Sequence, residues 1–211
     1  MPRMLDLCSG LGGASQAFLE AGWDVTRIEN NPLLATPSGG YYVQNTHNID
    51  VFDFDYIRNP IETIEIFNKK YDFVWASPTC TGFSNAYAAP MPTARRNNEK
   101  YQPDMSLVLK CHEIIQKINP KNWVIENVSG SSKYISKSLG MPPWQIIGPF
   151  FLWGRFPFVS VNRDLDHRKG DNCRHSEDPL KSVIKAKIPI EISRAFLDAL
   201  TNQKTLVDFY E

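Results

Sequence analysis

Two short apolar runs, each ending abruptly in polar residues, constrain the fold of this chain most. The first, residues 71–76, leads into the polar turn Ser-Pro-Thr-Cys-Thr-Gly, and the second, residues 123–126, ends at Glu126. Such runs are typical of strands that are buried on both faces of a parallel sheet. Because the carboxyl ends of adjacent parallel strands open into one crevice, we expect the Cys80 thiol and the Glu126 carboxylate to share a site.

Strand-like and helix-like patterns alternate along most of the chain. The expected strands are residues 4–8, 25–29, 48–54, 71–76 and 123–126, and the expected helices are residues 14–21, 61–68 and 104–118. This alternation predicts an α/β fold with a doubly wound, mostly parallel sheet, in a single domain over residues 1–211. The last third differs, with paired strands expected at 150–153 and 156–161 around Gly154, and a closing helix at 188–200.

Two segments carry neither pattern. Residues 85–103 lack periodicity and contain three prolines, so we predict a long loop, which in a compact domain is usually functional or disordered. Residues 159–183 form a short polar, turn-rich insertion. Basic residues in both segments could face phosphates or could merely be solvated: Arg95, Arg96, Lys100, Arg163, Arg168, Lys169 and Arg174. The 23 basic and 23 acidic residues balance, so any polyanion site must be a local patch.

The cysteines are scattered, without a CxxC pair or a disulfide framework. We find no signal peptide and no apolar stretch of membrane-spanning length, and therefore expect a cytoplasmic, intracellular protein with no membrane partner. The spacing of His167, Cys173 and His175 matches no standard zinc pattern, and we expect no metal.

The glycine turn at residues 6–13 lies between an expected strand and an expected helix. Glycines let the backbone approach a ligand closely, and a helix N-terminus supplies N–H donors. Glu29 ends the next strand, where a carboxylate can accept hydrogen bonds from a ribose. Together these features favour a nucleoside-containing cofactor, although the G-x-G-G spacing is not the dinucleotide fingerprint and glycine can serve packing alone.

Cys80 is the candidate nucleophile, because its turn is too polar for a core position. A thiol needs help from its site to ionise at neutral pH. Glu126, held protonated or hydrogen-bonded to a ring nitrogen, would let an aromatic heterocycle accept that nucleophile. Cys111, on its helix, fits an inert buried residue, and Cys8 fits the wall of a pocket.

In their order, these motifs resemble the C5-cytosine-specific DNA methyltransferases over residues 4–154, with a weaker echo at 186–200. The turn around Cys80 resembles that family's Pro-Cys-Gln-x-Phe-Ser loop, and residues 126–128 reproduce its Glu-Asn-Val motif. The resemblance implies S-adenosylmethionine as cofactor and DNA as partner. The implied cofactor contacts are Asp6, Cys8, Ser9, Gly10, Leu11, Gly13, Glu29, Asn30, Asp50, Val51, Thr79, Leu107 and Ile188. The implied substrate contacts are Ser84, Arg95, Arg96, Asn127 and Arg155.

The resemblance also implies a mechanism. Cys80 would add to cytosine C6 while Glu126 binds the N3 edge, which makes C5 nucleophilic enough to take the methyl group. Loss of the C5 proton would then expel Cys80. In duplex DNA the base must first be extruded, at a cost of roughly a few kcal/mol, and residues 85–103 would close over it.

The chain departs from the family pattern in four places. Thr79 and Thr81 replace a proline and a glutamine around Cys80, and Ala186-Lys187 replaces an Asn-Ser pair. Residues 145–149 lack both arginines of a Gln-x-Arg-x-Arg motif, so Arg155 or an arginine of the 85–103 loop is the expected substitute. Only residues 159–183 stand where a target-recognition domain is usual. Small methylase-like proteins of phages and archaea share this layout, which suggests a prokaryotic or viral gene.

Four readings of the activity are possible, of which we expect the first. The first is DNA cytosine-5 methylation with short or relaxed sequence specificity, since little surface remains to read base edges. The second is RNA cytosine methylation, because the short layout also suits a structured or single-stranded target. The third is a catalytically silent binding protein, and the fourth is an enzyme whose recognition domain is a separate subunit.

Overall fold

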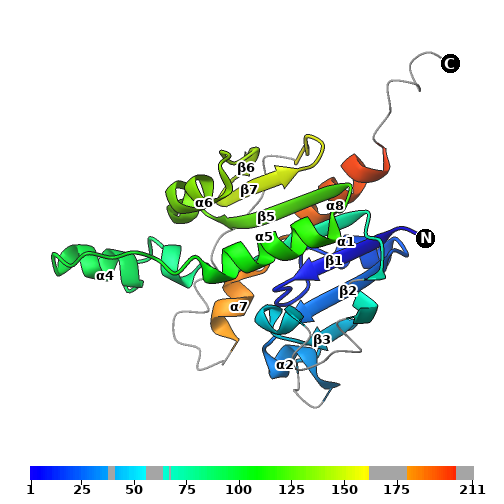
Figure 1. The fold of residues 1–211 in the computed structure, drawn as a ribbon, viewed down its shortest axis with the longest axis horizontal. Helices are drawn as coiled ribbons and strands as arrows, with labels where there is room; N and C mark the ends of the chain where they lie inside the picture. Colours follow the sequence, from blue (N-terminus) through cyan, green and yellow to red (C-terminus); the bar gives the residue numbers. More distant parts are fainter. Residues whose placement is uncertain (38–40, 56–63, 67, 162–179, 203–211) are drawn as a thin grey trace.

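The computed structural model describes residues 1–37, 41–55, 64–66, 68–161 and 180–202. Seven strands form one sheet in the order β3-β2-β1-β4-β5-β7-β6 (Figure 1). The strands are β1 (Arg3–Leu7), β2 (Asp24–Glu29), β3 (Thr46–Asn48), β4 (Phe73–Ala76), β5 (Asn122–Val128), β6 (Gln145–Ile147) and β7 (Phe150–Arg155). The first five are parallel, and β7 runs antiparallel between β5 and β6. The predicted mostly parallel α/β sheet is confirmed.

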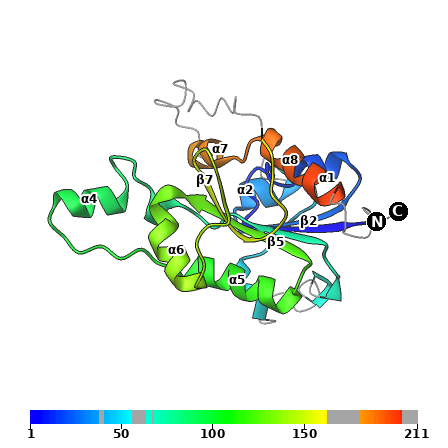
Figure 2. The same cartoon turned by 90° about the horizontal axis from the view of Figure 1, so that it is seen from above.

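Helices cover both faces of the sheet. The helices are α1 (Gln16–Glu20), α2 (Pro32–Ala35), α4 (Pro90–Arg96), α5 (Ser106–Ile118), α6 (Ser132–Leu139), α7 (Lys181–Ala186) and α8 (Ile190–Thr201), with 3-10 turns η2 (Val51–Asp55), η3 (Thr81–Phe83) and η4 (Ser129–Ser131). Figure 2 shows α1 and α8 on one face and α5 and α6 on the other. Alternate residues of a strand point to opposite faces, so Phe73 and Trp75 enter the α1–α8 core, and Val74 and Ala76 enter the α5 core.

The strand order changes direction at the boundary between β1 and β4 in the sheet. It first builds outward from β1 to β2 and β3, and then places β4 on the other side of β1. The carboxyl ends of β1 and β4 therefore flank a topological switch point, the usual position of a ligand crevice in open α/β sheets. The glycine turn follows β1 and the Cys80 loop follows β4, so both candidate motifs meet at this point.

Two predicted strands differ in the structure. The strand predicted at 48–54 is wrong except for Asn48, the last residue of β3. The Asp50 carboxylate accepts a hydrogen bond from Phe52 N (3.0 Å), and residues 51–55 form the 3-10 turn η2. The strand predicted at 156–161 is wrong. β7 instead continues through Gly154, which has φ +149°, and a Cβ there would overlap the carbonyl oxygen of Trp123 on β5.

Two segments predicted without regular structure contain helices. Within the predicted loop 85–103, α4 begins at Pro90, and prolines are compatible with a first helical turn because its N–H groups have no partner in the helix. Figure 1 shows α4 projecting away from the body of the molecule. The insertion 159–183 ends within α7, although its residues 162–179 lie outside the described ones, as do residues 61–63 and 67 of the helix predicted at 61–68.

Two global properties hold for the described part of the chain. None of its helices is long and apolar enough to span a membrane. Nor do its side chains contain a group of three or more His, Cys, Asp or Glu residues that could hold a metal ion. His167, Cys173 and His175, whose spacing was compared with zinc patterns, fall outside the described ranges.

Candidate active site

The glycine turn after β1 is held by hydrogen bonds to the neighbouring strand. Ser9 N donates to Ile28 O (3.1 Å), and Gly10 N donates to a Glu29 carboxylate oxygen (2.9 Å). The second Glu29 oxygen accepts from Asn31 N (2.9 Å). Each carboxylate oxygen can accept a further hydrogen bond, so Glu29 retains acceptor capacity for ligand hydroxyl groups.

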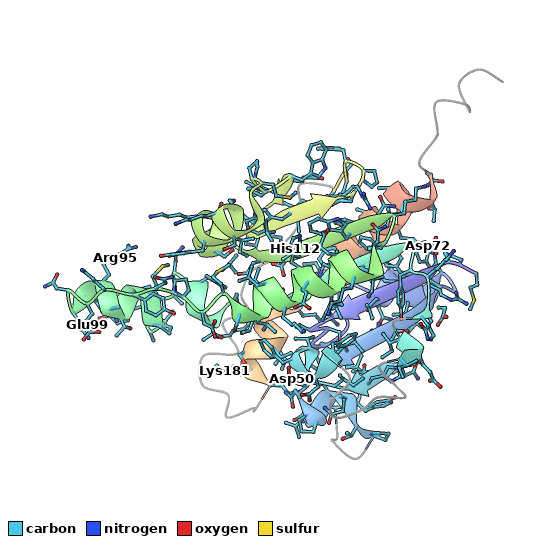
Figure 3. All side chains as sticks on the ribbon, in the orientation of Figure 1. Asp50, Asp72, Arg95, Glu99, His112 and Lys181 are labelled. Atoms are coloured by element: carbon cyan, nitrogen blue, oxygen red, sulfur yellow. The ribbon has the colours of Figure 1, made fainter. Side chains whose placement is uncertain are left out.

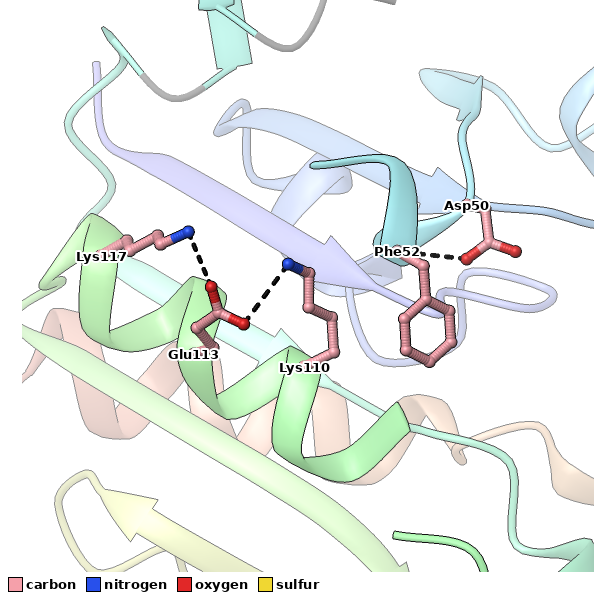
Figure 4. Close-up of polar contacts among 5 residues, drawn as sticks. All are labelled: Asp50, Phe52, Lys110, Glu113 and Lys117. Atoms are coloured by element: carbon pink, nitrogen blue, oxygen red, sulfur yellow. Dashed lines mark hydrogen bonds and ion pairs between the residues drawn. The ribbon is translucent and has the colours of Figure 1, made fainter. Parts of the chain in front are cut away.

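The acidic residue after β3 is hydrogen-bonded to the residue that follows Glu29. Asp50 accepts hydrogen bonds from the Asn30 side chain (3.3 Å) and from Phe52 N, the latter drawn in Figure 4. Val51 is buried, whereas the Phe52 side chain is 47 % exposed. An exposed aromatic ring next to two polar side chains is suited to the flat face and polar edge of a purine.

Two buried polar atoms near the glycine turn have no hydrogen-bond partner among the described residues: Asp6 Oδ1 and Ser9 Oγ. Burial raises the pKa of Asp6 to about 6, while Ser15 and Arg27 oppose that rise. Buried polar groups are nearly always paired, so these two atoms fit a polar group of a bound molecule. The residues present therefore fit a cofactor with a cationic or hydroxyl-bearing part.

The remaining predicted cofactor residues gather around the same turn. Cys8 has φ +56°, and its sulfur lies 3.9 Å from that of Cys111 on α5, a contact that raises the pKa of Cys8. Leu107, on the first turn of α5, packs with Cys8 against the core of this face. Gly13 lies against the backbone of Ile188, and Leu11 is half-buried within the turn.

The Cys80 loop begins directly after β4. Ser77 N donates to Leu7 O (3.1 Å), which ties the loop to the end of β1. Cys80 is half-buried, and its carbonyl oxygen accepts from Phe83 N (2.9 Å) to close the 3-10 turn η3. The exposed Thr79 forms a hydroxyl–hydroxyl hydrogen bond with Thr81 (3.1 Å), so the two threonines that replace proline and glutamine stabilise each other.

Three contacts fasten the Cys80 loop to the end of β5. The Ser77 hydroxyl hydrogen-bonds Glu126, and the Asn127 side-chain amide donates to Pro78 O (2.9 Å). Farther along, a Cβ at Gly130 would overlap the carbonyl oxygen of Phe83, so the two loops touch backbone to backbone. Because Cys80 lies between these contacts, the loop that carries the thiol is fixed against the strand that carries the acid.

Glu126 lies in an environment that favours its protonated form. Its side chain is buried, and burial raises its pKa to about 7, while the Ser77 hydrogen bond opposes the rise. The Trp75 indole N–H in turn donates to Ser77 Oγ (2.7 Å), which fixes the hydroxyl. At neutral pH a substantial fraction of Glu126 therefore carries a proton, and it can donate to a ring nitrogen or accept from it.

The predicted substrate residues do not all join this site. Arg155 ends β7 opposite Trp123 at the amino end of β5, and it donates to Lys121 O (2.9 Å) and Pro120 O (2.5 Å). This is the opposite end of β5 from Glu126, so the structure does not bring Arg155 together with the acid. Asn127 is buried; its side-chain amide donates to Pro78 O and its side-chain oxygen accepts from Val128 N, so it ties the Cys80 loop to β5.

The other residues predicted to contact substrate lie along the projecting segment. Ser84 follows η3, and its hydroxyl accepts from Ala86 N (3.2 Å). Arg95 and Arg96 are exposed on α4, and Figure 3 shows Arg95 at the part of the molecule farthest from the sheet. The Arg96 guanidinium lies 3.9 Å from the centre of the Tyr87 ring.

Sequence reasoning missed three residues that build the site: Trp75, Ser77 and Gly130. Trp75 reads as an ordinary core residue, and its hydrogen bond to Ser77 is visible only in three dimensions. Gly130 carried a usable signal, since a glycine just after a polar strand end indicates a close approach of two backbones.

Comparisons with known proteins identify the family of this chain. The model of the family described as C-5 cytosine-specific DNA methylase matches residues 2–136. A protein of Frog virus 3 (isolate Goorha), described as "Probable DNA (cytosine-5)-methyltransferase", is 25% identical over 131 residues, which cover 59% of this chain and 53% of that protein. The chain thus spans about half the length of this curated relative.

A solved structure gives a further match. It is described as a "putative DNA modification methyltransferase encoded within prophage" from E. coli, with 22% identity and a TM-score of 0.41 over 65% of this chain and 36% of that one. The family match alone covers more than half of the present sequence. The chain therefore belongs to the C-5 cytosine-specific DNA methylase family.

Proposed function

We propose that this protein methylates C5 of cytosine in DNA, with S-adenosylmethionine as the methyl donor. The observation that carries the proposal is the fastening of the Cys80 loop to Glu126 and its neighbours, next to the glycine turn. A nucleophile and an acid held on adjacent strands can act on two positions of the same ring. Membership of the DNA methylase family supports DNA as the substrate.

The chemistry assigned to the chain begins with addition. The Cys80 thiolate forms a bond to cytosine C6, and the electron pair of the C5–C6 double bond becomes available at C5. Protonated Glu126 donates a hydrogen bond to N3, which stabilises the charge that develops in the ring. S-adenosylmethionine, when bound, supplies the methyl group that C5 takes. Loss of the C5 proton to a base then restores the double bond and expels Cys80 as a thiolate.

The cofactor is assigned to the groups around the glycine turn. Asp6 Oδ1 and Ser9 Oγ, which have no partner in the described chain, suit the charged amino-acid part of S-adenosylmethionine. Glu29 has acceptor capacity for ribose hydroxyls, and Asp50 with the exposed Phe52 ring suits the adenine. Each group lies at the carboxyl end of β1, β2 or β3.

Substituting Gly130 with alanine tests whether the two loops must touch. The added methyl group would push Phe83 away, and Phe83 N closes the turn at Cys80. We expect kcat to fall about 100-fold, because a displacement of about 1 Å at a reacting group has that effect, with unchanged affinity for S-adenosylmethionine. Gly140→Ala is the control: φ is +69° there and the space is open, so it should lower stability by about 1 kcal/mol and spare kcat. Equal kcat values in the two variants would contradict the proposal that the contact between Gly130 and Phe83 positions the Cys80 loop.

Removing the two arginines of α4 tests the DNA contact. The R95A/R96A double variant should raise the KM for duplex DNA about tenfold, because both arginines are exposed on α4 and cationic side chains of this kind contact phosphates. The slope of log affinity against log salt should fall by about 2, roughly one for each lost phosphate contact. Lys137→Ala, an exposed cation on α6, is the matched control. An unchanged salt slope would remove α4 from the DNA interface.

Methyl transfer from tritiated S-adenosylmethionine to duplex DNA, single-stranded DNA and tRNA tests the function itself. We expect label in duplex DNA, at cytosine C5. Label in tRNA alone would reassign the substrate to RNA. Cofactor binding without label in any nucleic acid would contradict an autonomous enzyme, and label that requires an added protein would identify a separate recognition subunit.

A further inference from the structure

One arginine is buried in the sheet beneath the proposed cofactor turn. Arg27, in the middle of β2, is 1 % exposed and lies opposite Asp6 of β1 in the parallel register. Burial lowers the pKa of Arg27, and the Asp6 carboxylate opposes that effect. Burying a guanidinium is unfavourable unless hydrogen bonds replace the lost water, so such a position calls for an explanation.

The guanidinium bridges three separate parts of the chain. Its Nε donates to Ser15 Oγ (2.8 Å), its Nη2 to Gly12 O (3.3 Å) and its Nη1 to Gln44 O (2.8 Å). The Ser15 hydroxyl links Arg27 to Asp6, because it accepts from Arg27 Nε and donates to Asp6 Oδ2 (2.6 Å). Arg27 thus joins the glycine turn, the start of α1 and the segment before β3.

These contacts determine the position of the groups assigned to the cofactor. A Cβ at Gly12 would come within 2.8 Å of the guanidinium, so the turn rests directly on Arg27. Gly12 N in turn donates to Ser9 O (2.8 Å), which places Ser9. The hydrogen bond from Ser15 to Asp6 Oδ2 fixes the carboxylate and leaves Oδ1 without a partner among the described residues.

We infer that Arg27 is a positioning residue for S-adenosylmethionine binding: through Ser15 and Gly12 it holds Asp6 and Ser9 in the orientation that receives the cofactor. The inference rests on the proposed function, because it concerns the same cofactor site. Arg27 does not contact the reacting atoms. Its planar fork is what the site requires, since a lysine at residue 27 has a single nitrogen and cannot reach three acceptors on different segments.

The test measures binding of S-adenosylhomocysteine, the unreactive product, by titration calorimetry. Arg27→Met should weaken binding at least about tenfold, and Ser15→Ala should weaken it a few-fold, as expected for disturbed charge-assisted hydrogen bonds. Arg27→Lys should not restore the affinity. The control is Arg3→Met, which removes an exposed ion pair with Asp24 (3.2 Å) between the same two strands at their other end. The affinity of each variant for a duplex oligonucleotide should stay unchanged, because a general loss of structure would weaken both ligands together.

Each outcome bears on the inference separately from the proposed function. If wild-type protein does not bind S-adenosylhomocysteine, the proposed function fails. If the wild type binds and a folded Arg27→Met variant binds equally well, the positioning role is overturned and the proposed function stands. If Arg27→Met does not fold, Ser15→Ala decides, and wild-type affinity in that variant overturns the role.

Discussion

Replacing Cys80 with serine is expected to abolish methyl transfer while S-adenosylmethionine still binds. A serine hydroxyl is a far weaker nucleophile than a thiolate, so no bond to C6 would form and C5 would stay too electron-poor to accept the methyl group. Removing a nucleophile typically costs on the order of 10⁴-fold or more in kcat. The measurement is tritium incorporation into duplex DNA, alongside calorimetric binding of the cofactor.

The matched control is Cys111→Ala. Cys111 is fully buried on α5, and in our proposal it takes no part in the chemistry. This variant should keep turnover within a few-fold of wild type. Substantial turnover in Cys80→Ser, or an equal loss in both variants, would contradict the assignment of Cys80 as the nucleophile.

Replacing Glu126 with glutamine has the second-largest expected effect. Loss of the acid should lower kcat by roughly 10²- to 10⁴-fold, the usual range for a general acid. In the wild type the alkaline limb of the kcat/KM profile should fall as pH rises through about 7, because kcat/KM reports the free enzyme, burial raises the pKa of Glu126 there to about 7, and the protonated form is the donor. In Glu126→Gln this limb should disappear. A glutamine variant with wild-type kcat would remove Glu126 from the mechanism.

The same carboxyl group should make stability depend on pH. Its pKa is raised in the folded state from 4.5 to about 7, so the folded protein holds a proton that the unfolded chain has already released. The resulting stability is fully present below pH 4.5 and is lost as pH rises through 7. At about 1.4 kcal/mol for each pKa unit, the loss is at most about 3.5 kcal/mol. Glu126→Gln should therefore gain Tm relative to wild type at pH 8 but not at pH 4.5.

Glu113 is the control for this titration. Its carboxylate lies between Lys117 (2.7 Å) and Lys110 (3.3 Å), as drawn in Figure 4, and the Lys117 hydrogen bond lowers its pKa. Because its stabilising contribution is present above its unfolded pKa, Glu113→Gln should give a similar Tm difference from wild type at pH 6 and pH 8. The difference for Glu126→Gln should widen between the same two pH values.

The fold was largely predictable where an apolar run ends in polar residues. The strand predicted at 71–76 is β4, and that predicted at 123–126 is β5, because a strand buried on both faces requires a continuous apolar stretch. The same pattern placed Cys80 and Glu126 at one edge of the sheet. Their proximity was predictable because the carboxyl ends of adjacent parallel strands lie at the same end of the sheet.

The remainder depended on contacts between distant segments. Gly154 reads as a turn residue, but the close approach of β5 makes it part of a continuous β7. The antiparallel pairing of β7 with β5 places Arg155 at the amino end of β5, away from Glu126. No local sequence pattern reveals this pairing. Arg27 is one of four polar or charged residues in the sequence of β2, so the sequence does not single it out, and its partners on the glycine turn and at Gln44 come from segments brought together only by the fold.

Our central claim is that Cys80 and Glu126 act on the same extruded cytosine. It is tested most directly by mass spectrometry after incubation with S-adenosylmethionine and duplex DNA that contains 5-fluorocytosine, where fluorine in place of the C5 proton blocks the final elimination. We predict a stable covalent adduct on the peptide that contains Cys80, absent in Cys80→Ser and strongly reduced in Glu126→Gln. Tight cofactor binding with no adduct on duplex DNA, single-stranded DNA or RNA that carries the same base would contradict the claim.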